Sequence, residues 1–150
     1  METAPRFTKI DRLTETGSEH IVTLDNLTNL HWTAGDAIDQ DVNHEQALAA
    51  IAKLNEQAFG GFTDWRMPEV EELFLLADRS RHSPAIDIEF FPTCKSDWYW
   101  SATDDATEDK DEQTGHSKYA WVVYFGGGSS NLDPRGYCYR VRAVRGPSRQ

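Results

Sequence analysis

The stretch Gly61-Phe-Thr-Asp-Trp-Arg-Met-Pro68 decides how the chain is arranged, because it separates two segments with helical sequence patterns. Before it, apolar residues recur at helical spacing over about 44–58, and Asn43 with Gln46 matches a capping box. The proline that ends the stretch suits the first turn of a second helix, whose pattern fades by Arg79. We therefore expect two helices joined by this connection.

Strand patterns lie on both sides of the helical part. Residues 18–34 are expected to form two short strands around a turn: a β-branched run at 20–24 and a second extended run at 30–33. Three later runs are rich in aromatic and β-branched residues: Trp98–Ala102, Tyr119–Phe125 and Tyr137–Val144. They are separated by an acidic stretch, 104–112, and by a glycine-rich stretch, 126–131, which is expected to be a flexible loop. Two helices followed by a run of strands with long loops predict an α+β fold.

Length and composition indicate one folded domain over residues 1–150. The chain is 39% hydrophobic and 27% charged, which is too apolar for a disordered chain. It has no apolar run of about 18 residues, the length that a membrane span requires. The first residues lack the basic start and apolar stretch of a secretory signal, so we expect a cytoplasmic location with reduced thiols. Whether Cys94 and Cys138 pair under oxidising conditions stays open.

The charge balance restricts the partners. The formal net charge is −10, and a surface of that sign repels phosphate backbones. Direct nucleic-acid binding is therefore not expected, unless the basic C-terminus acts alone. That C-terminus carries Arg135, Arg140, Arg142, Arg145 and Arg149. These arginines either form an anion site for sulfated glycan or phosphate, or pair with the acidic loops of the chain itself, which is the favoured interpretation.

Several segments, taken together, resemble the Lcl C-terminal domain, a bacterial and phage-borne domain. These segments are Asp25–Trp32, Gly61–Pro68 with Glu72 and Leu73, Phe90–Pro92, Tyr99–Thr103, Ala120–Phe125 and Val141–Arg145. The resemblance implies a C-type-lectin-like fold, with two helices packed on small antiparallel sheets and long loops, related to the formylglycine-generating-enzyme group. Members usually sit on secreted or surface proteins, and one branch is similar to a glycan-binding adhesin module.

The Asp64-Trp65-Arg66 motif is interpreted as structural. Asp64 precedes a predicted helix and is expected to cap it, Trp65 to fill core, and Arg66 to reach a buried carboxylate or carbonyl. Trp100 and Trp121 are also expected in the core, with Trp98 more open. Strand alternation places Trp98 and Trp100 on one face.

Catalysis and metal binding are not supported by the residue patterns. The iron-dependent enzymes of the related fold group use His-x-x-x-His-x-Glu, and no His pair here has that spacing. Cys138 has no second cysteine near it, unlike the paired cysteines of the formylglycine-generating enzymes, and is expected to be a small buried side chain. The calcium-binding triplets of lectins are absent, and a cation site at Asn131 and Asp133 is disfavoured. We expect no enzyme activity, no cofactor and no metal.

The favoured function is a non-catalytic binding module that contacts a protein partner through the loops 104–118 and 126–137. The candidate contact residues are Asp104, Asp105, Glu108, Asp109, Asp111, Glu112, Asn131, Asp133, Arg135 and Tyr137. One alternative is an acidic inhibitor from a phage or mobile element, anti-CRISPR-like, that mimics nucleic-acid charge and covers the basic surface of a nucleic-acid-binding complex. Another is a glycan-binding domain that uses Trp98, Tyr137 and the C-terminal arginines.

Overall fold

The computed structural model describes residues 5–106, 110, 112 and 117–146. It contains two α-helices and two small antiparallel sheets, so the predicted α+β class is confirmed. The elements are β1 (Phe7–Thr14), β2 (Gly17–Asp25), β3 (Leu30–Thr33), α1 (His44–Glu56), the 3-10 turn η1 (Phe59–Gly61), α2 (Val70–Leu76), β4 (Trp98–Asp104), β5 (Tyr119–Tyr124), β6 (Ser129–Pro134) and β7 (Val144–Arg145). No helix in the described part of the chain is long and apolar enough to cross a membrane.

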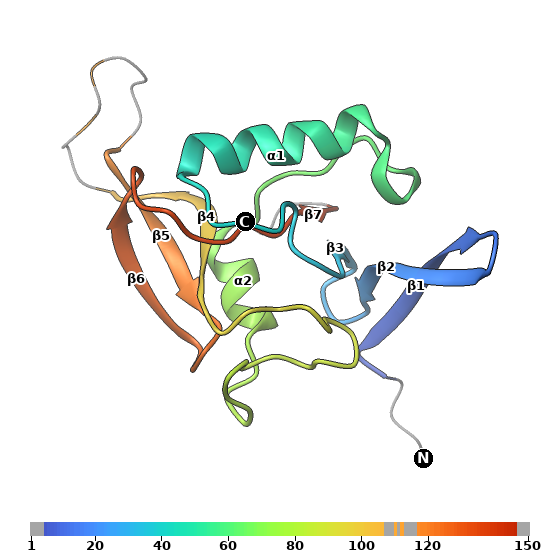
Figure 1. Cartoon of the computed structure of the whole chain (residues 1–150). Helices are drawn as coiled ribbons and strands as arrows, with labels where there is room; N and C mark the ends of the chain where they lie inside the picture. Colours follow the sequence, from blue (N-terminus) through green and yellow to red (C-terminus); the bar gives the residue numbers. More distant parts are fainter. Residues whose placement is uncertain (1–4, 107–109, 111, 113–116, 147–150) are drawn as a thin grey trace.

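The first sheet has the strand order β1-β2-β3-β7. The hairpin of β1 and β2 projects from the body of the molecule (Figure 1). The strands β2 and β3 were predicted as two extended runs around a turn, the first of them rich in β-branched residues, whereas β1 was not predicted. Most of β1 is exposed, so its side chains show little of the alternation that marks a half-buried strand.

The second sheet has the strand order β4-β5-β6. Two predictions about the strands after residue 125 are wrong. The glycine-rich stretch is not a loop throughout: Gly126–Gly128 forms the turn, and β6 then pairs with the whole of β5, from Tyr124↔Ser129 to Tyr119↔Pro134. The long strand predicted over 137–144 is also absent. Only Val144 and the residue after it join a sheet, and the residues before it form isolated bridges instead.

Both helices start at a capping box. In α1, Asn43 accepts from the backbone of Gln46, as predicted. In α2, the N-cap is Glu69 and its capping partner is Glu72, so the helix begins two residues after Pro68. Asp64 lies well before this start, and the expectation that it caps α2 is wrong. Figure 1 shows α1 lying across both sheets, with α2 beside the three-stranded sheet.

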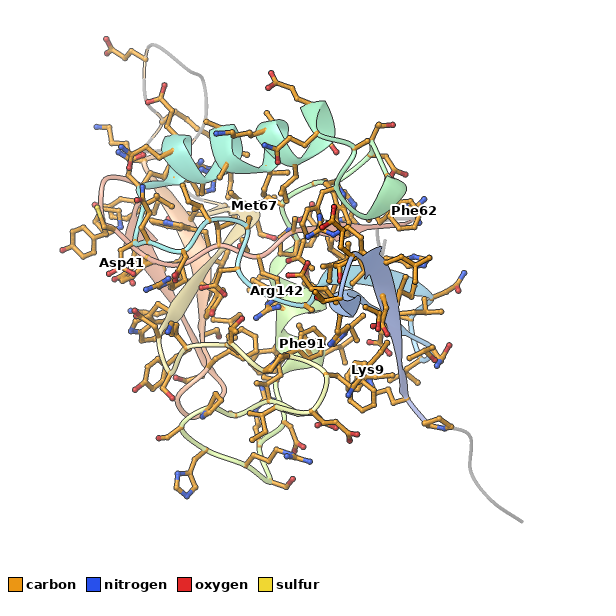
Figure 2. The ribbon with its side chains drawn as sticks, turned by 45° about the vertical axis from the view of Figure 1, so that its right-hand side comes forward. Lys9, Asp41, Phe62, Met67, Phe91 and Arg142 are labelled. Carbon is orange, nitrogen blue, oxygen red and sulfur yellow. The ribbon has the colours of Figure 1, made fainter. Side chains whose placement is uncertain are left out.

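The C-terminal segment, residues 139–145, runs between the two sheets. Its backbone bridges to Val42, to Tyr99 and to Arg66. At its centre the fully buried Arg142 donates to the carbonyl oxygens of residues 33–35 and lies 3.6 Å from the carboxylate of Asp36. Arg142 therefore occupies the interior, beside Phe91 (Figure 2). One cationic side chain thus ties the C-terminal segment to the loop that follows β3.

Candidate functional site

One face of the three-stranded sheet carries a group of aromatic side chains. Residues directly opposite each other in an antiparallel pair point to the same face. Trp98 is paired with Tyr124, and the pairs of β5 with β6 place Asn131 and Asp133 on that same face. The chain after β6 adds Tyr137 and Tyr139. We call these six residues, Trp98, Tyr124, Asn131, Asp133, Tyr137 and Tyr139, the aromatic face.

The rings of the aromatic face contact one another in a continuous row. The ring centroids of Trp98 and Tyr124 are 4.9 Å apart, and those of Trp98 and Tyr139 are 6.4 Å apart. Tyr137 continues the row at 6.2 Å from Tyr139. Trp98, Tyr124 and Tyr139 are half-buried, whereas Tyr137 is 53% exposed. The face therefore offers large apolar area to a ligand, in rings held by their neighbours.

Polar groups hold Tyr139 within the row of rings. The hydroxyl of Tyr139 donates to a carboxylate oxygen of Asp133 at 2.8 Å, and the amide of Asn131 donates to the other oxygen at 3.3 Å. Burial, followed by this carboxylate, raises the pKa of Tyr139, so its hydroxyl stays protonated at neutral pH. Donors and acceptors thus stand directly beside the rings.

The inner end of the aromatic face rests on the core. Trp100 is fully buried, as predicted, and its indole N–H donates to the carbonyl oxygen of Val42 at 2.8 Å. Its ring lies 5.2 Å from that of Tyr139. Gly126 supports the other side, because a Cβ at that position would overlap the ring of Tyr124. The positions of the two tyrosines therefore depend on neighbours that are themselves fixed.

Asp104, a predicted contact residue, does not join the group of rings. Asp104 is half-buried and forms an ion pair with Arg135, which also donates to Ser117 O at 2.7 Å and to His44 Nδ1 at 2.8 Å. Burial lowers the pKa of Arg135. Arg135 is thus held internally rather than presented to a partner.

The rest of the acidic stretch is described only in part. Asp105 is half-exposed and Glu112 is exposed. Glu108, Asp109 and Asp111 lie outside the described residues. Of the predicted contact residues, the structure therefore brings together Asn131, Asp133 and Tyr137 on the aromatic face, and it sets Asp104 and Arg135 apart as an internal pair.

The C-terminal arginines that the structure describes pair with the chain's own carboxylates, which was the favoured interpretation, whereas Arg149 lies outside the described residues. Arg140 forms ion pairs with three aspartates of the loop after β3, namely Asp36, Asp39 and Asp41. Arg145 binds Asp64 with its guanidinium at 2.7 and 3.0 Å. Since Arg142 is buried, the described arginines of this segment do not form an open anion site.

The Asp64-Trp65-Arg66 motif is structural, but not in every predicted way. Asp64 is largely exposed, and the hydrogen bond from Arg145 lowers its pKa. Trp65 is buried, as predicted. Arg66 reaches the buried carboxylate of Glu72 through two hydrogen bonds of 2.8 and 2.7 Å, which raise the pKa of the guanidinium. The motif thus holds the connection onto the first turn of α2.

The predicted burial of Trp121 and of Cys138 is wrong, because both side chains are more exposed than expected. Trp121 is half-buried and lines a surface pocket, because alternation along β5 turns it to the sheet face opposite Tyr124. Cys138 is exposed rather than buried, since its segment leaves the sheet. Cys94 is buried, which raises the pKa of its thiol, and the two cysteines are not bonded to each other.

The aromatic face combines apolar ring surface with a hydroxyl, a carboxylate and an amide. In the described part of the chain, no group of three or more His, Cys, Asp or Glu side chains is arranged to hold a metal ion. Tyr124 and Tyr139 were not among the residues predicted from the sequence. A signal for both was available in the sequence. Side chains alternate between the two faces of a strand, which places Trp98 and Trp100 on one face. The same alternation, applied to residues 119–125 and to Tyr-x-Tyr at 137–139, would have pointed to Tyr124 and Tyr139.

A comparison with protein-family models matches residues 21–145 to the Lcl C-terminal domain. The match covers most of the chain, including both helices and all strands except β1 and the start of β2. No curated protein matches the chain.

Proposed function

The chain belongs to the Lcl C-terminal domain family, and from this premise we propose that it is a non-catalytic binding module that contacts a protein partner through the aromatic face. The observation that carries the proposal is the continuous row of Trp98, Tyr124, Tyr139 and Tyr137, with the last ring 53% exposed. We also infer that the α+β scaffold is of the C-type-lectin-like kind that the family implies.

The composition of the aromatic face matches that of protein interfaces. Tyrosine and tryptophan are enriched at the centres of interfaces, where they bury large areas with few rotatable bonds to restrict. Asp133 and Asn131 add hydrogen-bonding groups at the margin of the rings. Because the rings pack on the core through Trp100, little conformational entropy remains to be lost on binding.

The test is a comparison of variants as bait in a pull-down from a bacterial lysate. Tyr137→Ala removes the most exposed ring, and Gly126→Ala displaces the ring of Tyr124 without changing any side chain of the aromatic face. Leu48→Ala is the matched control, because Leu48 is an exposed apolar residue on α1. We expect the same protein to be captured by the unchanged chain and by Leu48→Ala, and lost from both face variants. An identical set of captured proteins in all four samples would contradict the proposal.

The salt dependence of capture separates this function from the acidic inhibitor. An interface of packed rings keeps its partner as salt rises, whereas a mimic of nucleic-acid charge loses it steeply. The inhibitor is supported if capture fails at high salt and also fails when Asp105, Glu112 and the neighbouring carboxylates are replaced by amides.

A glycan ligand is the second candidate that the aromatic face itself favours. Aromatic faces beside carboxylate and amide groups also suit the apolar and hydroxyl surfaces of a sugar ring. An array of neutral and sulfated glycans tests it: binding that Tyr137→Ala abolishes would support a glycan ligand, and a blank array at high protein concentration would exclude one.

A further inference from the structure

The opposite face of the three-stranded sheet carries a groove against α2. It is lined by Val70, Glu71, Phe74, Thr103, Trp121 and Ser130, and its volume is about 320 Å³. We call it the α2 groove. Helix α2 packs against β4 and β5 beside it, so its walls come from four elements that are fixed to one another.

Two aromatic rings form the walls of the α2 groove. Trp121 is half-buried and lines the groove, and no other ring or cation of the described residues stacks on it, so the exposed part of its ring is available to a ligand. Phe74 is 41% exposed, and the guanidinium of Arg79 stacks on it with its central carbon 3.8 Å from the ring centroid. This aromatic surface thus already accommodates one guanidinium. Arg79 itself is held outside the groove by a 2.8 Å hydrogen bond to Gly128 O.

A carboxylate without a partner stands at the edge of the α2 groove. Glu71 is exposed and forms no hydrogen bond or ion pair with the described residues. Its neighbours differ: Glu72 is paired with Arg66, and Glu69 accepts from Thr103 at 2.8 Å. The net charge of −10 adds a negative field around the groove. Apolar aromatic walls with one free carboxylate are complementary to a cation on an apolar stem.

We propose that the α2 groove binds an arginine side chain of a basic protein partner. The methylene stem lies along Val70 and Phe74, the guanidinium stacks on Trp121, and Glu71 accepts hydrogen bonds from its N–H groups. Arginine fits better than lysine, because its planar group stacks on an indole and also donates two parallel hydrogen bonds to a carboxylate. The proposal is independent of the aromatic face, which lies on the other side of the sheet.

The experiment titrates the chain with the peptides acetyl-Gly-Arg-Gly-amide and acetyl-Gly-citrulline-Gly-amide, followed by NMR chemical shifts of the Trp indole N–H groups. Citrulline has nearly the shape of arginine without its charge. We expect the arginine peptide to bind at least tenfold more tightly and to shift the Trp121 signal. Equal binding of the two peptides, or no binding of the arginine peptide at millimolar concentration, would overturn the proposal.

Variants assign the binding to the groove. Glu71→Gln should weaken the binding of the arginine peptide about fivefold, which is the factor typical of losing an exposed ion pair. Glu45→Gln removes the same charge from an exposed position on α1 and should leave binding unchanged. If the two variants weaken binding equally, only net charge is acting and the proposal fails. Tyr137→Ala should also leave peptide binding unchanged, so that failure of the groove and failure of the aromatic face are distinguished.

Discussion

The ion pair between Arg66 and Glu72 gives the sharpest stability prediction. The side chain of Glu72 is 1% exposed and that of Arg66 is 27% exposed. Besides its two hydrogen bonds to the guanidinium, the Glu72 carboxylate accepts from the backbone of Glu69 at 2.8 Å. Glu72→Gln keeps the size and one acceptor oxygen, but it replaces the other oxygen with an amide donor facing the guanidinium.

The magnitude follows from the burial of the pair. A charge-assisted hydrogen bond contributes about 1.5–3 kcal/mol, and breaking a pair costs about 0–1 kcal/mol at the surface and about 3–5 kcal/mol when fully buried. With one partner buried and the other partly exposed, we expect Glu72→Gln to lower the free energy of unfolding by about 2 kcal/mol. With a urea slope of about 2 kcal/mol per molar, the midpoint of unfolding moves down by about 1 M.

The control is the neighbouring residue on the same helix. Glu71→Gln removes a charge from the same turn, but Glu71 is exposed and unpaired among the described residues, so its effect should stay within about 0.5 kcal/mol. A double-mutant cycle with Arg66→Met should assign most of the Glu72 effect to the pair. Urea midpoints that coincide for Glu72→Gln and Glu71→Gln would refute the reasoning.

Three further measurements follow from the structure. Asp64→Ala should lower the melting temperature slightly at low salt and not at high salt, because Asp64 forms an exposed ion pair and caps no helix; a loss that persists at high salt would indicate a cap. Ser80→Ala should raise the pKa of Asp78, which the Ser80 hydroxyl lowers, as an NMR titration of the carboxyl group would show. Since the folded pKa lies below the unfolded one, the stability that Ser80 contributes through Asp78 is present at neutral pH and is lost as the pH falls through the folded pKa. A thiol reagent should modify Cys138 rapidly and Cys94 only on unfolding, so Cys138→Ser should abolish the fast phase; a fast phase that survives would contradict the burial of Cys94.

Elements with a strong local signal could be predicted from the sequence. The capping box of Asn43 and Gln46 located the start of α1, and the β-branched run of residues 20–24 located β2. In both, the residues that favour the element locally are also those that the rest of the fold buries or caps.

Other elements depend on partners that are distant in sequence. The strand β6 reads Ser-Ser-Asn-Leu-Asp-Pro, a composition of low strand propensity, and it is extended because β5 supplies a complete ladder. Conversely, residues 137–143 have a strand composition but bridge to separate segments, including Val42 and Tyr99, rather than to one strand. Tertiary pairing overrides propensity in both directions. For that reason the site was predicted as two loops, although four of the six residues of the aromatic face lie on strands.

The C-terminal segment also determines the order in which the chain can become compact during synthesis. Arg142 donates to Thr33, which lies 109 positions earlier, so the C-terminal segment and the end of β3 are tied together only when one of the last parts of the described chain arrives. Closing loops of that length is slow, and ribosomes deliver the N-terminal residues first. Until residue 142 leaves the ribosome, the carbonyl oxygens of residues 33–35 lack the donor that they have in the folded chain. The nascent chain is therefore expected to gain its full protection from proteases only after this segment has been made.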